Sequence, residues 1–319
     1  MAETVNVPKA GVEKRNMTEA QQPFVVSIIL NTNRREDTLE CLQSLKKSSY
    51  ARHKVLVMDN SSTDGSLESI RSSYPDIRII QLEQNLGYAG NNNVGIHAAL
   101  EMGADWVFIL NEDVVLDDDT IAQLIAEAEK DELIGVLGPL VYHYDDPIII
   151  QSAGGILTTD WSAHHRGENL RDDGQFTIPE EVDWISGCAI LVRKEAIELI
   201  GGLDERFFYY WEETEWCTRA RLSGWKVLNV PAAKLWHKGV QQNYQPSPNI
   251  TYYWTRNWLL FLVKHHAPLR AWIATLYLLT RTLISWTLRK RWKRKREHRD
   301  AMWQGMMDFV RRRWGMRVK

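Results

Sequence analysis

The sequence predicts an α/β fold with a mostly parallel central sheet, and three observations support this prediction. Apolar, β-branched runs alternate with segments of helical periodicity between residues 24 and 113. The first run, FVVSIIL (24–30), is apolar throughout, which is typical of a strand buried on both faces of a parallel sheet. The alternation has the cadence of βαβ units, whose crossovers make neighbouring strands parallel.

The individual elements follow from local patterns along the chain. Leu39, Leu42 and Leu45 have helical spacing, so a helix is expected after the first strand. Further strands are expected at 54–59, 77–82 and 105–113, separated by a short helix and by a glycine-ended helix over 88–103. The second half is less regular, with expected strands near 134–141, 148–157, 182–192, 226–229 and 233–236, and expected helices near 118–129, 193–200 and 211–223.

Length and composition exclude several classes of protein. A chain of 319 residues can bury a large core and fits one large domain with an appendage, or two small domains. Its three cysteines have no CxxC spacing, so neither a zinc site nor a disulfide framework is indicated, and a reducing cytoplasm is expected. Residues 1–22 carry charges and no apolar run, which predicts a disordered leader rather than a signal peptide.

Charge is distributed unevenly along the chain. The net charge is −2, but residues 264–319 hold sixteen Lys/Arg against three Asp/Glu, which gives this segment +13 and leaves −15 on residues 1–263. Seven of the fourteen tryptophans lie from Trp254 onward. We therefore expect an acidic globular body followed by a basic, Trp-rich helical tail over residues 251–319.

Polar residues follow four of the predicted strands. In parallel sheets, ligands bind beyond the carboxyl ends of the strands, and these ends meet at one rim. The sequence therefore predicts a ligand site at that rim. Its polar residues are Asn31, Thr32, Asn33 and Arg34, then Asp59 and Asn60, then Asn85 and Gly87, and then Asn111, Glu112 and Asp113.

Asp113 and His237 are the candidate metal ligands. A carboxylate held at the end of a rigid strand can bind Mg²⁺ or Mn²⁺ while phosphate oxygens and water fill the other positions. A neutral imidazole beside the same rim can complete the shell. Asp113 is equally consistent with an acidic loop that caps the next helix, as Asp117 to Asp119 also are, and a lone histidine is often structural.

The segment NLGYAGNNNVG places Gly87, Gly90 and Gly95 around a predicted helix start. Free backbone N–H groups at such a start suit a phosphate, although glycines there also serve tight packing. The spacing is not GxGxxG and no GK[ST] follows, so a nicotinamide-binding Rossmann site and a Walker P-loop are disfavoured.

Taken together, these segments resemble the inverting glycosyltransferases of family 2, and within them the rhamnosyltransferase-like branch. The resemblance covers residues 24–240 in the family's order and spacing. The matching segments are VSIILNTNRREDTLECLQSL, VLVMDNSSTDGS, NLGYAGNNNVGI, ILNEDV and the stretch from WISGCAILVRKEAIELIGG to VPAAKLWHKG. The resemblance implies a GT-A fold, an αβα sandwich, with a catalytic domain over 23–250, a donor half over 23–115 and an acceptor half over 116–250.

The resemblance also implies roles for individual residues. In the donor site, Asp59 would accept from the nucleotide base. The other expected donor residues are Thr32, Arg34, Asn85, Gly87, Tyr88, Asn92, Asn93, Asn111 and Glu112. Asp113, the last residue of the NED counterpart of the DXD motif, and His237 would hold Mg²⁺ or Mn²⁺. The expected acceptor residues are Trp184, Ser186, Gly187, Trp211 and Glu212. The family's usual Glu-Asp pair is Glu212-Glu213 here, so the base would be a glutamate, one methylene longer.

Helical geometry separates the three glutamates of YYWEETEW (209–216). Glu213 shares a helix face with Cys217 and Ala220, a small apolar stripe expected to pack toward the sheet. Glu215 is expected to form a surface ion pair with Arg219, four residues on. Glu213 is therefore the expected catalytic base, and Glu212 an acceptor contact. The rings of Trp211 and Trp184 suit stacking on sugars, or equally a place in the core.

The basic tail has the features of a membrane-surface segment. The apolar run 271–280 is too short to span a bilayer. Basic residues cluster in RKRWKRKR (289–296), which favours anionic lipid. Trp303, Met306, Met307, Val310 and Trp314 are expected on one face of an amphipathic helix. Residues 264–319 therefore predict peripheral attachment to the cytoplasmic face of the membrane. Nucleic acid is a disfavoured alternative, and a homodimer interface on this helix stays open.

The expected reaction is transfer of L-rhamnose from dTDP-L-rhamnose to a hydroxyl of a lipid-linked or cell-surface glycan. A UDP-linked hexose or galactofuranose is the alternative donor. A nucleotide-sugar-binding assembly protein without catalysis is the alternative for the chain as a whole, because a fold does not fix a function.

Overall fold

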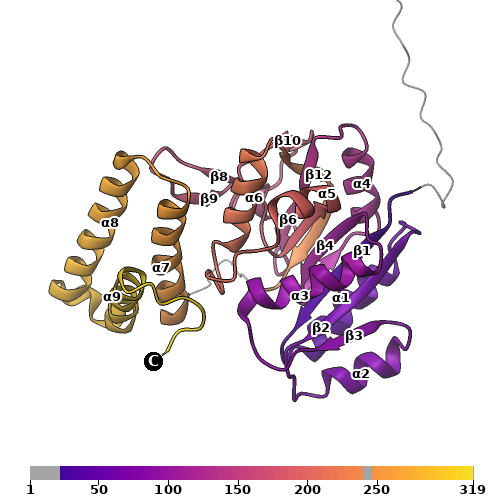
Figure 1. Cartoon of the computed structure of the whole chain (residues 1–319), viewed down its shortest axis with the longest axis horizontal. Helices are drawn as coiled ribbons and strands as arrows, with labels where there is room; N and C mark the ends of the chain where they lie inside the picture. Colours follow the sequence, from indigo (N-terminus) through magenta and orange to yellow (C-terminus); the bar gives the residue numbers. More distant parts are fainter. Residues whose placement is uncertain (1–21, 240–245, 319) are drawn as a thin grey trace, which may run out of the picture.

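The computed structural model of the chain describes residues 22–239 and 246–318. The expected leader therefore lies outside the described residues, except for Gln22. An α/β domain and a bundle of three helices lie side by side (Figure 1). The bundle is the C-terminal helical part that the sequence predicts.

The α/β domain is built on a mixed sheet of ten strands among the described residues. Its main path runs β10-β12-β6-β11-β4-β1-β2-β3, with β5 beside β12 and β7 beside β6. The strands are β1 (Val25–Asn31), β2 (His53–Asp59), β3 (Arg78–Gln81), β4 (Trp106–Asn111), β5 (Val114–Leu116), β6 (Ile134–His143), β7 (Ile150–Ser152), β10 (Glu180–Glu181), β11 (Ala189–Arg193) and β12 (Lys226–His237). A separate hairpin pairs β8 (Gly155–Leu157) with β9 (Ala163–His165).

The first four long strands form the parallel block that the sequence predicts. β1 pairs in parallel with β2 and β4, and β2 pairs in parallel with β3. β11 then inserts antiparallel between β4 and β6, and β6 pairs in parallel with β12. The expectation of a mostly parallel α/β sheet is thus confirmed. The two strands expected near 226–229 and 233–236 are one strand, β12, with a register shift between Val230 and Lys234.

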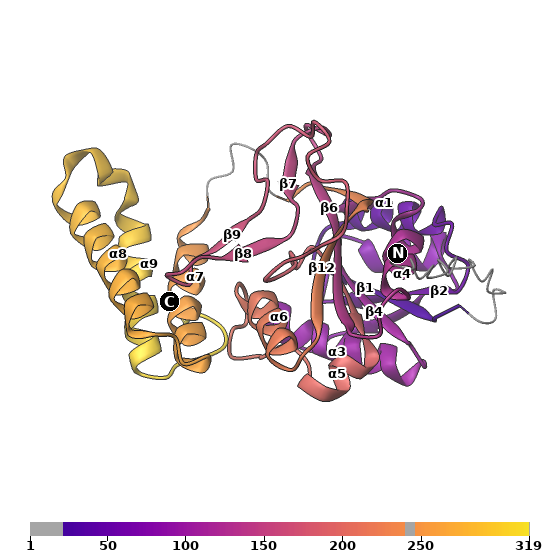
Figure 2. The ribbon, with the colours of Figure 1, turned by 90° about the horizontal axis from the view of Figure 1, so that it is seen from above.

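Helices cover both faces of this sheet (Figure 2). One face carries α1 (Arg35–Lys46), α2 (Ser66–Ser73) and α4 (Thr120–Ala128), and the other carries α3 (Gly87–Glu101), α5 (Lys194–Ile200) and α6 (Glu212–Leu222). Strand side chains alternate between two apolar cores accordingly, with Val25 and Ile29 in one and Val26 and Ile28 in the other. The expected Asp cap of α4 does not form, because Asp119 makes no side-chain bond to the helix start.

The bundle consists of α7 (Pro248–Lys264), α8 (Leu269–Leu288), the 3-10 turn η2 (Lys290–Lys295) and α9 (Arg296–Val310). α9 packs closely on α7, since a Cβ on Gly305 would lie 2.7 Å from the Tyr252 carbonyl oxygen. Within the described ranges, none of the helices combines the length and apolar character needed to cross a bilayer.

One expectation for the tail is wrong in detail. Trp303 and Val310 of α9 are exposed, but Met306 packs into an apolar cluster with Leu259 and Leu279 of the neighbouring helices. Trp314 lies beyond the end of α9. The residues expected on one exposed face are therefore divided between the bundle interior and the surface.

Candidate active site

A cleft of about 740 Å³ lies at the carboxyl ends of β1 and β4 and extends to α6 and α7. It brings together residues that the sequence analysis assigned to the donor, the metal, the acceptor and the base. Those residues are Thr32, Arg34, Asn85, Gly87, Tyr88, Asn111, Glu112, Asp113, Trp184, Ser186, Gly187, Trp211, Glu212, Glu213 and His237. Both halves of the expected catalytic domain contribute to this one cleft.

Asp59 is not among the residues that line the cleft. Its side chain is fully buried, and its carboxylate accepts from Asn31 Nδ2 at 2.7 Å and from the Ser62 backbone N–H at 3.0 Å. The next residue, Asn60, lines the cleft instead. Asp59 thus organises the loop after β2, and its contact with a base stays a prediction.

Asn92 and Asn93 also point away from the cleft. Asn92 is buried and donates from Nδ2 to the Tyr88 carbonyl. Asn93 exchanges hydrogen bonds with the backbone of Leu203, which ties α3 to the loop after α5. Asn91 lines the cleft in their place.

Strand pairing brings the two expected metal ligands together. Val114 of β5 is paired with His237 at the end of β12, and this register places the Asp113 carboxylate 3.1 Å from His237 Nε2. On its other side, His237 Nδ1 lies 3.0 Å from Gln151 Oε1. The amide oxygen accepts the ring proton, so Nε2 presents its lone pair to Asp113.

This pair fits a divalent cation. When the His237 ring is neutral, two acceptor atoms face one another, and either a proton or a metal cation between them makes the contact favourable. A Cβ on Gly239 would lie 2.6 Å from Asp113 Oδ2 and 3.0 Å from His237 Nε2, so glycine keeps the space beside both side chains open. Burial works to raise the pKa of Asp113, but the hydrogen bond and charge of a protonated His237 hold this pKa below its usual value.

The rest of the ILNEDV motif adds weaker groups. Asn111 Nδ2 lies 3.5 Å from His237 Nε2. Burial, followed by the charge of Asp113, raises the pKa of Glu112 to about 7. In the part of the chain that the structure describes, no group of three or more His, Cys, Asp or Glu side chains is arranged to hold a metal ion.

The N-terminus of α6 delivers two carboxylates to the opposite part of the cleft. Burial raises the pKa of Glu213 to about 7. Burial and the charge of Glu213 raise the pKa of Glu212 well above its usual value. A Cβ on Gly187 would lie 3.2 Å from the Tyr88 hydroxyl, so this glycine lets Tyr88 pack closely beside the two carboxylates. As predicted, Cys217 and Ala220 on the same helix face are fully buried.

Several buried polar atoms of the cleft have no hydrogen-bond partner among the described residues. They are Asp113 Oδ1, Glu212 Oε2, Glu213 Oε2, Trp184 Nε1 and Trp211 Nε1. Buried polar atoms are almost always paired, so such a group of exceptions indicates a polar ligand. The two indole N–H groups are donors and the three carboxylate oxygens are acceptors, which suits a ligand rich in hydroxyl groups.

Trp184 and Trp211 are core residues that also line the cleft, and their stacking on a sugar stays a prediction. Both are almost completely buried. Trp211 stacks on Trp258 with ring centroids 6.1 Å apart, and Trp184 packs on His165 at 4.7 Å. Each is a core residue, and each also lines the cleft.

A strained loop precedes α6. Phe208, Tyr210 and Trp211 have φ values of 64°, 70° and 75°, a left-handed conformation that bulky residues seldom adopt. Each such residue costs on the order of 1–3 kcal/mol and persists only where surrounding contacts hold it. The strain lies directly before the two carboxylates.

Two residues of α7 hold this loop. Asn257 Nδ2 lies within 2.7–2.9 Å of the carbonyl oxygens of Phe207, Tyr209 and Tyr210. Arg256 Nη2 donates to the Phe207 carbonyl at 2.9 Å, and both side chains are fully buried. Sequence reasoning missed this pair because α7 was assigned to the tail. The signal in the sequence was an Arg-Asn dipeptide within an apolar helix, which requires internal partners.

Gly87 packs α3 against the same loop. Its φ is 76°, and a Cβ there would lie 2.3 Å from the Phe208 carbonyl oxygen. The nearby backbone N–H groups already have partners, since Leu86 donates to Asn91 Oδ1 and Gly87 to Asn85 Oδ1. Of the two interpretations of these glycines, the structure favours tight packing.

Glu215 does pair with Arg219, at 2.8 Å, but the expectation of a surface pair is wrong. The Glu215 side chain is fully buried, with Lys264 Nζ 2.8 Å and His265 Nε2 3.2 Å away. Despite burial, these partners lower the pKa of Glu215 to about 2. Glu215 therefore ties α6 to the end of α7.

The fold is that of solved GT-A glycosyltransferases. The chain matches the family model for glycosyl transferase family 2 over residues 27–201, more than half its length, and belongs to that family.

Among its relatives is the N-acetylglucosaminyl-diphospho-decaprenol L-rhamnosyltransferase of Mycobacterium tuberculosis, 29% identical over 285 residues, which cover 80% of this chain and 91% of the relative. The dTDP-rhamnosyl transferase RfbF of Shigella flexneri is 28% identical over 67% of this chain and 72% of its own.

Solved structures support the same fold. The mannosyltransferase of Pyrobaculum calidifontis in complex with GDP-Man and Mn²⁺ superposes with a TM-score of 0.58 at 14% identity, covering 92% of this chain and 89% of that one. TarS of S. aureus in complex with UDP-GlcNAc gives 0.59 at 17% identity, covering 90% and 81%.

We predict that neutralising two glutamates of α6 shifts the melting temperature in opposite directions. The folded state raises the pKa of Glu213 from 4.5 to about 7, so the stability present below pH 4.5 is lost as the pH rises to about 7. Glu213→Gln should therefore melt higher than the parent at pH 8, with the gain shrinking toward pH 4.5. Glu215 has a lowered pKa and stabilises the fold at all pH values above 4.5, an effect lost as pH falls toward 2.

Glu215→Gln should accordingly melt lower at pH 8, by an amount equivalent to roughly 3 kcal/mol, because it leaves Arg219 and Lys264 without their carboxylate. Differential scanning calorimetry of the three proteins from pH 5 to 8 measures both shifts. Shifts of the same sign at pH 8 would show that the two environments are not as described.

We predict that Asn257→Leu lowers kcat by about tenfold or more, because a relaxed loop misplaces the carboxylates. The matched control is Asn229→Leu, which removes a buried Asn that likewise donates to two carbonyls, those of Gly138 and Pro139. Both variants should lose stability, since each leaves buried carbonyls unpaired.

Only Asn257→Leu should lower kcat and shift the acidic limb of the pH–rate profile. Steady-state kinetics from pH 5.5 to 9 separate the two variants. Equal losses of kcat in both variants would show that Asn257 contributes to stability alone and does not position the carboxylates.

Proposed function

We propose that the chain is an inverting glycosyltransferase that moves L-rhamnose from dTDP-L-rhamnose to a hydroxyl of a lipid-linked glycan. The observation that carries this proposal is the buried Glu213 Oε2, which has no hydrogen-bond partner among the described residues and shares one cleft with the Asp113–His237 pair. A base and a cation site in the same cleft are what sugar transfer with inversion requires.

Inversion is an in-line displacement. The acceptor hydroxyl attacks the anomeric carbon while the nucleoside diphosphate leaves from the opposite face. Glu213 accepts the hydroxyl proton, and a base with a pKa of about 7 is well matched to this task near neutral pH. Burial and the charge of Glu213 also raise the pKa of Glu212, which lies beside the base and hydrogen-bonds an acceptor hydroxyl.

Asp113 and His237 would hold the Mg²⁺ or Mn²⁺ of the donor complex. The bound cation would neutralise charge that develops on the leaving diphosphate. The arrangement of the two facing acceptor atoms supports this assignment, as does the Pyrobaculum mannosyltransferase, which was solved in complex with Mn²⁺ and a nucleotide sugar. Thr32, Arg34, Asn60 and Asn85 line the part of the cleft that would receive the nucleotide.

The relatives support the choice of sugar and acceptor. Two of them are named as rhamnosyltransferases, and the name of the M. tuberculosis protein specifies an acceptor on diphospho-decaprenol. We extend this to a polyprenyl-diphosphate-linked acceptor, used at the cytoplasmic face of the membrane. The galactofuranosyltransferase GlfT1 of M. tuberculosis is 28% identical over 65% of this chain. Its name supports a galactofuranose donor as the alternative.

We predict that Glu213→Gln lowers kcat by about 10²–10⁴, the usual contribution of a general base. In the parent, kcat/KM should rise with pH to a plateau above about pH 7, as Glu213 loses its proton. Glu213→Asp, which restores the family's usual residue, should retain part of the activity. Full activity in Glu213→Gln would reject the base assignment.

We predict that dTDP-L-rhamnose with Mn²⁺ raises the melting temperature more than UDP-hexoses or UDP-galactofuranose do. A ligand at a hundred times its Kd stabilises the fold by about 2.7 kcal/mol. Asp113→Asn should abolish the part of the shift that requires Mn²⁺. A thermal-shift panel of these nucleotide sugars measures the difference. A larger shift with a UDP-sugar would contradict dTDP-L-rhamnose as the donor and favour that UDP-sugar.

A further inference from the structure

The helix α8 has an apolar face that no segment covers among the residues the structure describes. The residues of this face, the α8 stripe, are each 53–74% exposed: Leu269, Ile273, Tyr277, Ile284 and Leu288. Their spacing of four or seven positions puts them on one side of the helix. The buried side of α8 is formed by Ala271, Thr275 and Leu279, two positions out of phase and so on the opposite side.

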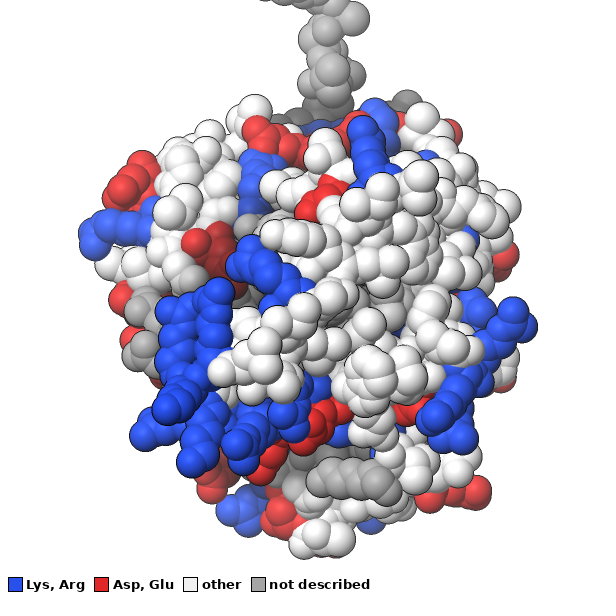
Figure 3. Space-filling view, turned by 90° about the vertical axis from the view of Figure 1, so that its left-hand side faces the viewer, with Lys and Arg blue, Asp and Glu red and all other residues white. Residues whose placement is uncertain are grey.

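Cations surround this stripe. Residues 265–296 contain nine Lys/Arg and no Asp or Glu. On the outer side of the bundle, Lys and Arg gather beside a broad uncharged area (Figure 3). The segment from Arg289 to Arg296 supplies seven of the nine.

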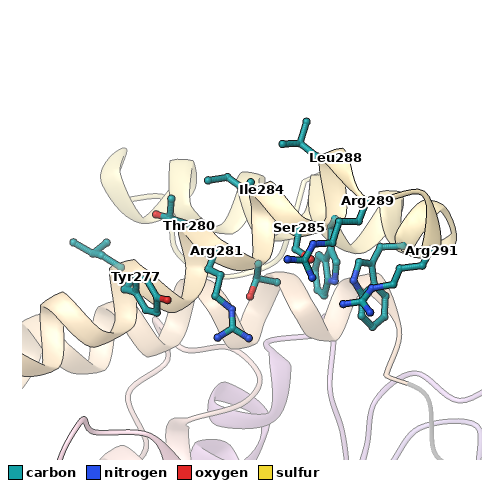
Figure 4. A pocket seen from close by; sticks show the side chains of 12 residues that line it. Tyr277, Thr280, Arg281, Ile284, Ser285, Leu288, Arg289 and Arg291 are labelled. Atoms are coloured by element: carbon teal, nitrogen blue, oxygen red, sulfur yellow. The ribbon is translucent and has the colours of Figure 1, made fainter.

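A groove of about 1130 Å³ joins the apolar and cationic parts. The side chains of Arg281, Arg289 and Arg291 reach along it, while Ile284 and Leu288 project from the same stretch of helix (Figure 4). Trp286 and Trp292 complete its wall. Guanidinium groups bind phosphate through paired N–H donors, and tryptophan favours the boundary between lipid headgroups and acyl chains.

We propose that α8 and η2 dock on an anionic phospholipid surface, with the α8 stripe buried at the acyl boundary and a phospholipid headgroup in the groove. This combination of apolar face, flanking cations and interfacial tryptophans is what interfacial helices use. The inference deepens the proposed function, since a lipid-linked acceptor would be met at the same surface. It moves the expected membrane contact from α9 to α8, because part of the α9 face is packed inside the bundle.

Other occupants fit this surface less well. A second copy of the chain would bring two apolar stripes together, but its residues 265–296 would add cations and no carboxylate to the interface. Nucleic acid would contact the arginines but leave the exposed leucine and isoleucine side chains without a partner, in an interface type that is normally polar. An anionic bilayer satisfies both the charges and the apolar stripe.

α7 connects the proposed membrane surface with the cleft. Its C-terminal end is joined to α8 by the short link 265–268, and residues Asn249, Tyr253 and Trp254 near its other end line the cleft.

Vesicle co-sedimentation of the full chain tests this proposal. The parent should bind vesicles containing phosphatidylglycerol, bind neutral phosphatidylcholine vesicles far less, and lose binding as salt is raised. Ile284→Glu combined with Leu288→Glu should weaken binding by roughly tenfold or more, as should Arg289→Glu combined with Arg291→Glu.

The matched control combines Leu199→Glu with Leu222→Glu, two leucines of the α/β domain that are 64% and 75% exposed, against 53% and 74% for Ile284 and Leu288. It should bind vesicles within about twofold of the parent. All variants should keep the parent's melting temperature, because every substituted side chain is exposed.

Three results would overturn the proposal: no binding to anionic vesicles, equal binding by the α8 and control variants, or a dimer in light scattering that Leu288→Glu dissociates while vesicles are not bound. Transfer to a short-chain, water-soluble acceptor is measured in parallel. Transfer without vesicle binding would reject only the α8 surface, and vesicle binding without transfer would reject only the proposed function.

Discussion

The clamp that Asn257 and Arg256 place on the loop before α6 is the constraint on which the site depends. Phe208, Tyr210 and Trp211 adopt left-handed backbone conformations there, which persist only where surrounding contacts hold them. Two buried side chains of α7 bind the carbonyls of Phe207, Tyr209 and Tyr210 in the same loop and so keep it in place. The first helix of the bundle, α7, therefore also positions the loop that precedes the two carboxylates of the candidate active site.

The same helix turn shows how environment separates identical side chains. The Glu213 carboxylate lies beside Glu212, and burial raises its pKa, with no cation among the described residues that lowers it. Glu215 is fully buried, but Arg219, Lys264 and His265 surround it and keep it ionised. One carboxylate is thus suited to exchange a proton near neutral pH, while the other is suited to hold α6 against α7.

Periodicity was sufficient to predict the parallel block β3-β2-β1-β4 and the rim where its polar residues meet, because these depend on local pattern. The Asp113–His237 pair was expected from resemblance, and the pairing of β5 with β12 supplies the reason for it. Local pattern could not reveal that Glu215 is buried, since Lys264 and His265 come from a distant helix. Nor could it reveal the role of Asn257, which depends on backbone carbonyls fifty residues earlier.

The central claim is that α7 holds the Glu212–Glu213 pair in a buried, proton-binding state. A direct test is a ¹³C NMR titration of the glutamate carboxyl carbons in the parent and in Asn257→Leu, with Glu213→Gln used for assignment. The account predicts an apparent pKa near 7 for the Glu213 signal in the parent and a fall toward 4.5 in Asn257→Leu. An ordinary carboxyl pKa in the parent, or the same raised pKa in both proteins, would contradict it.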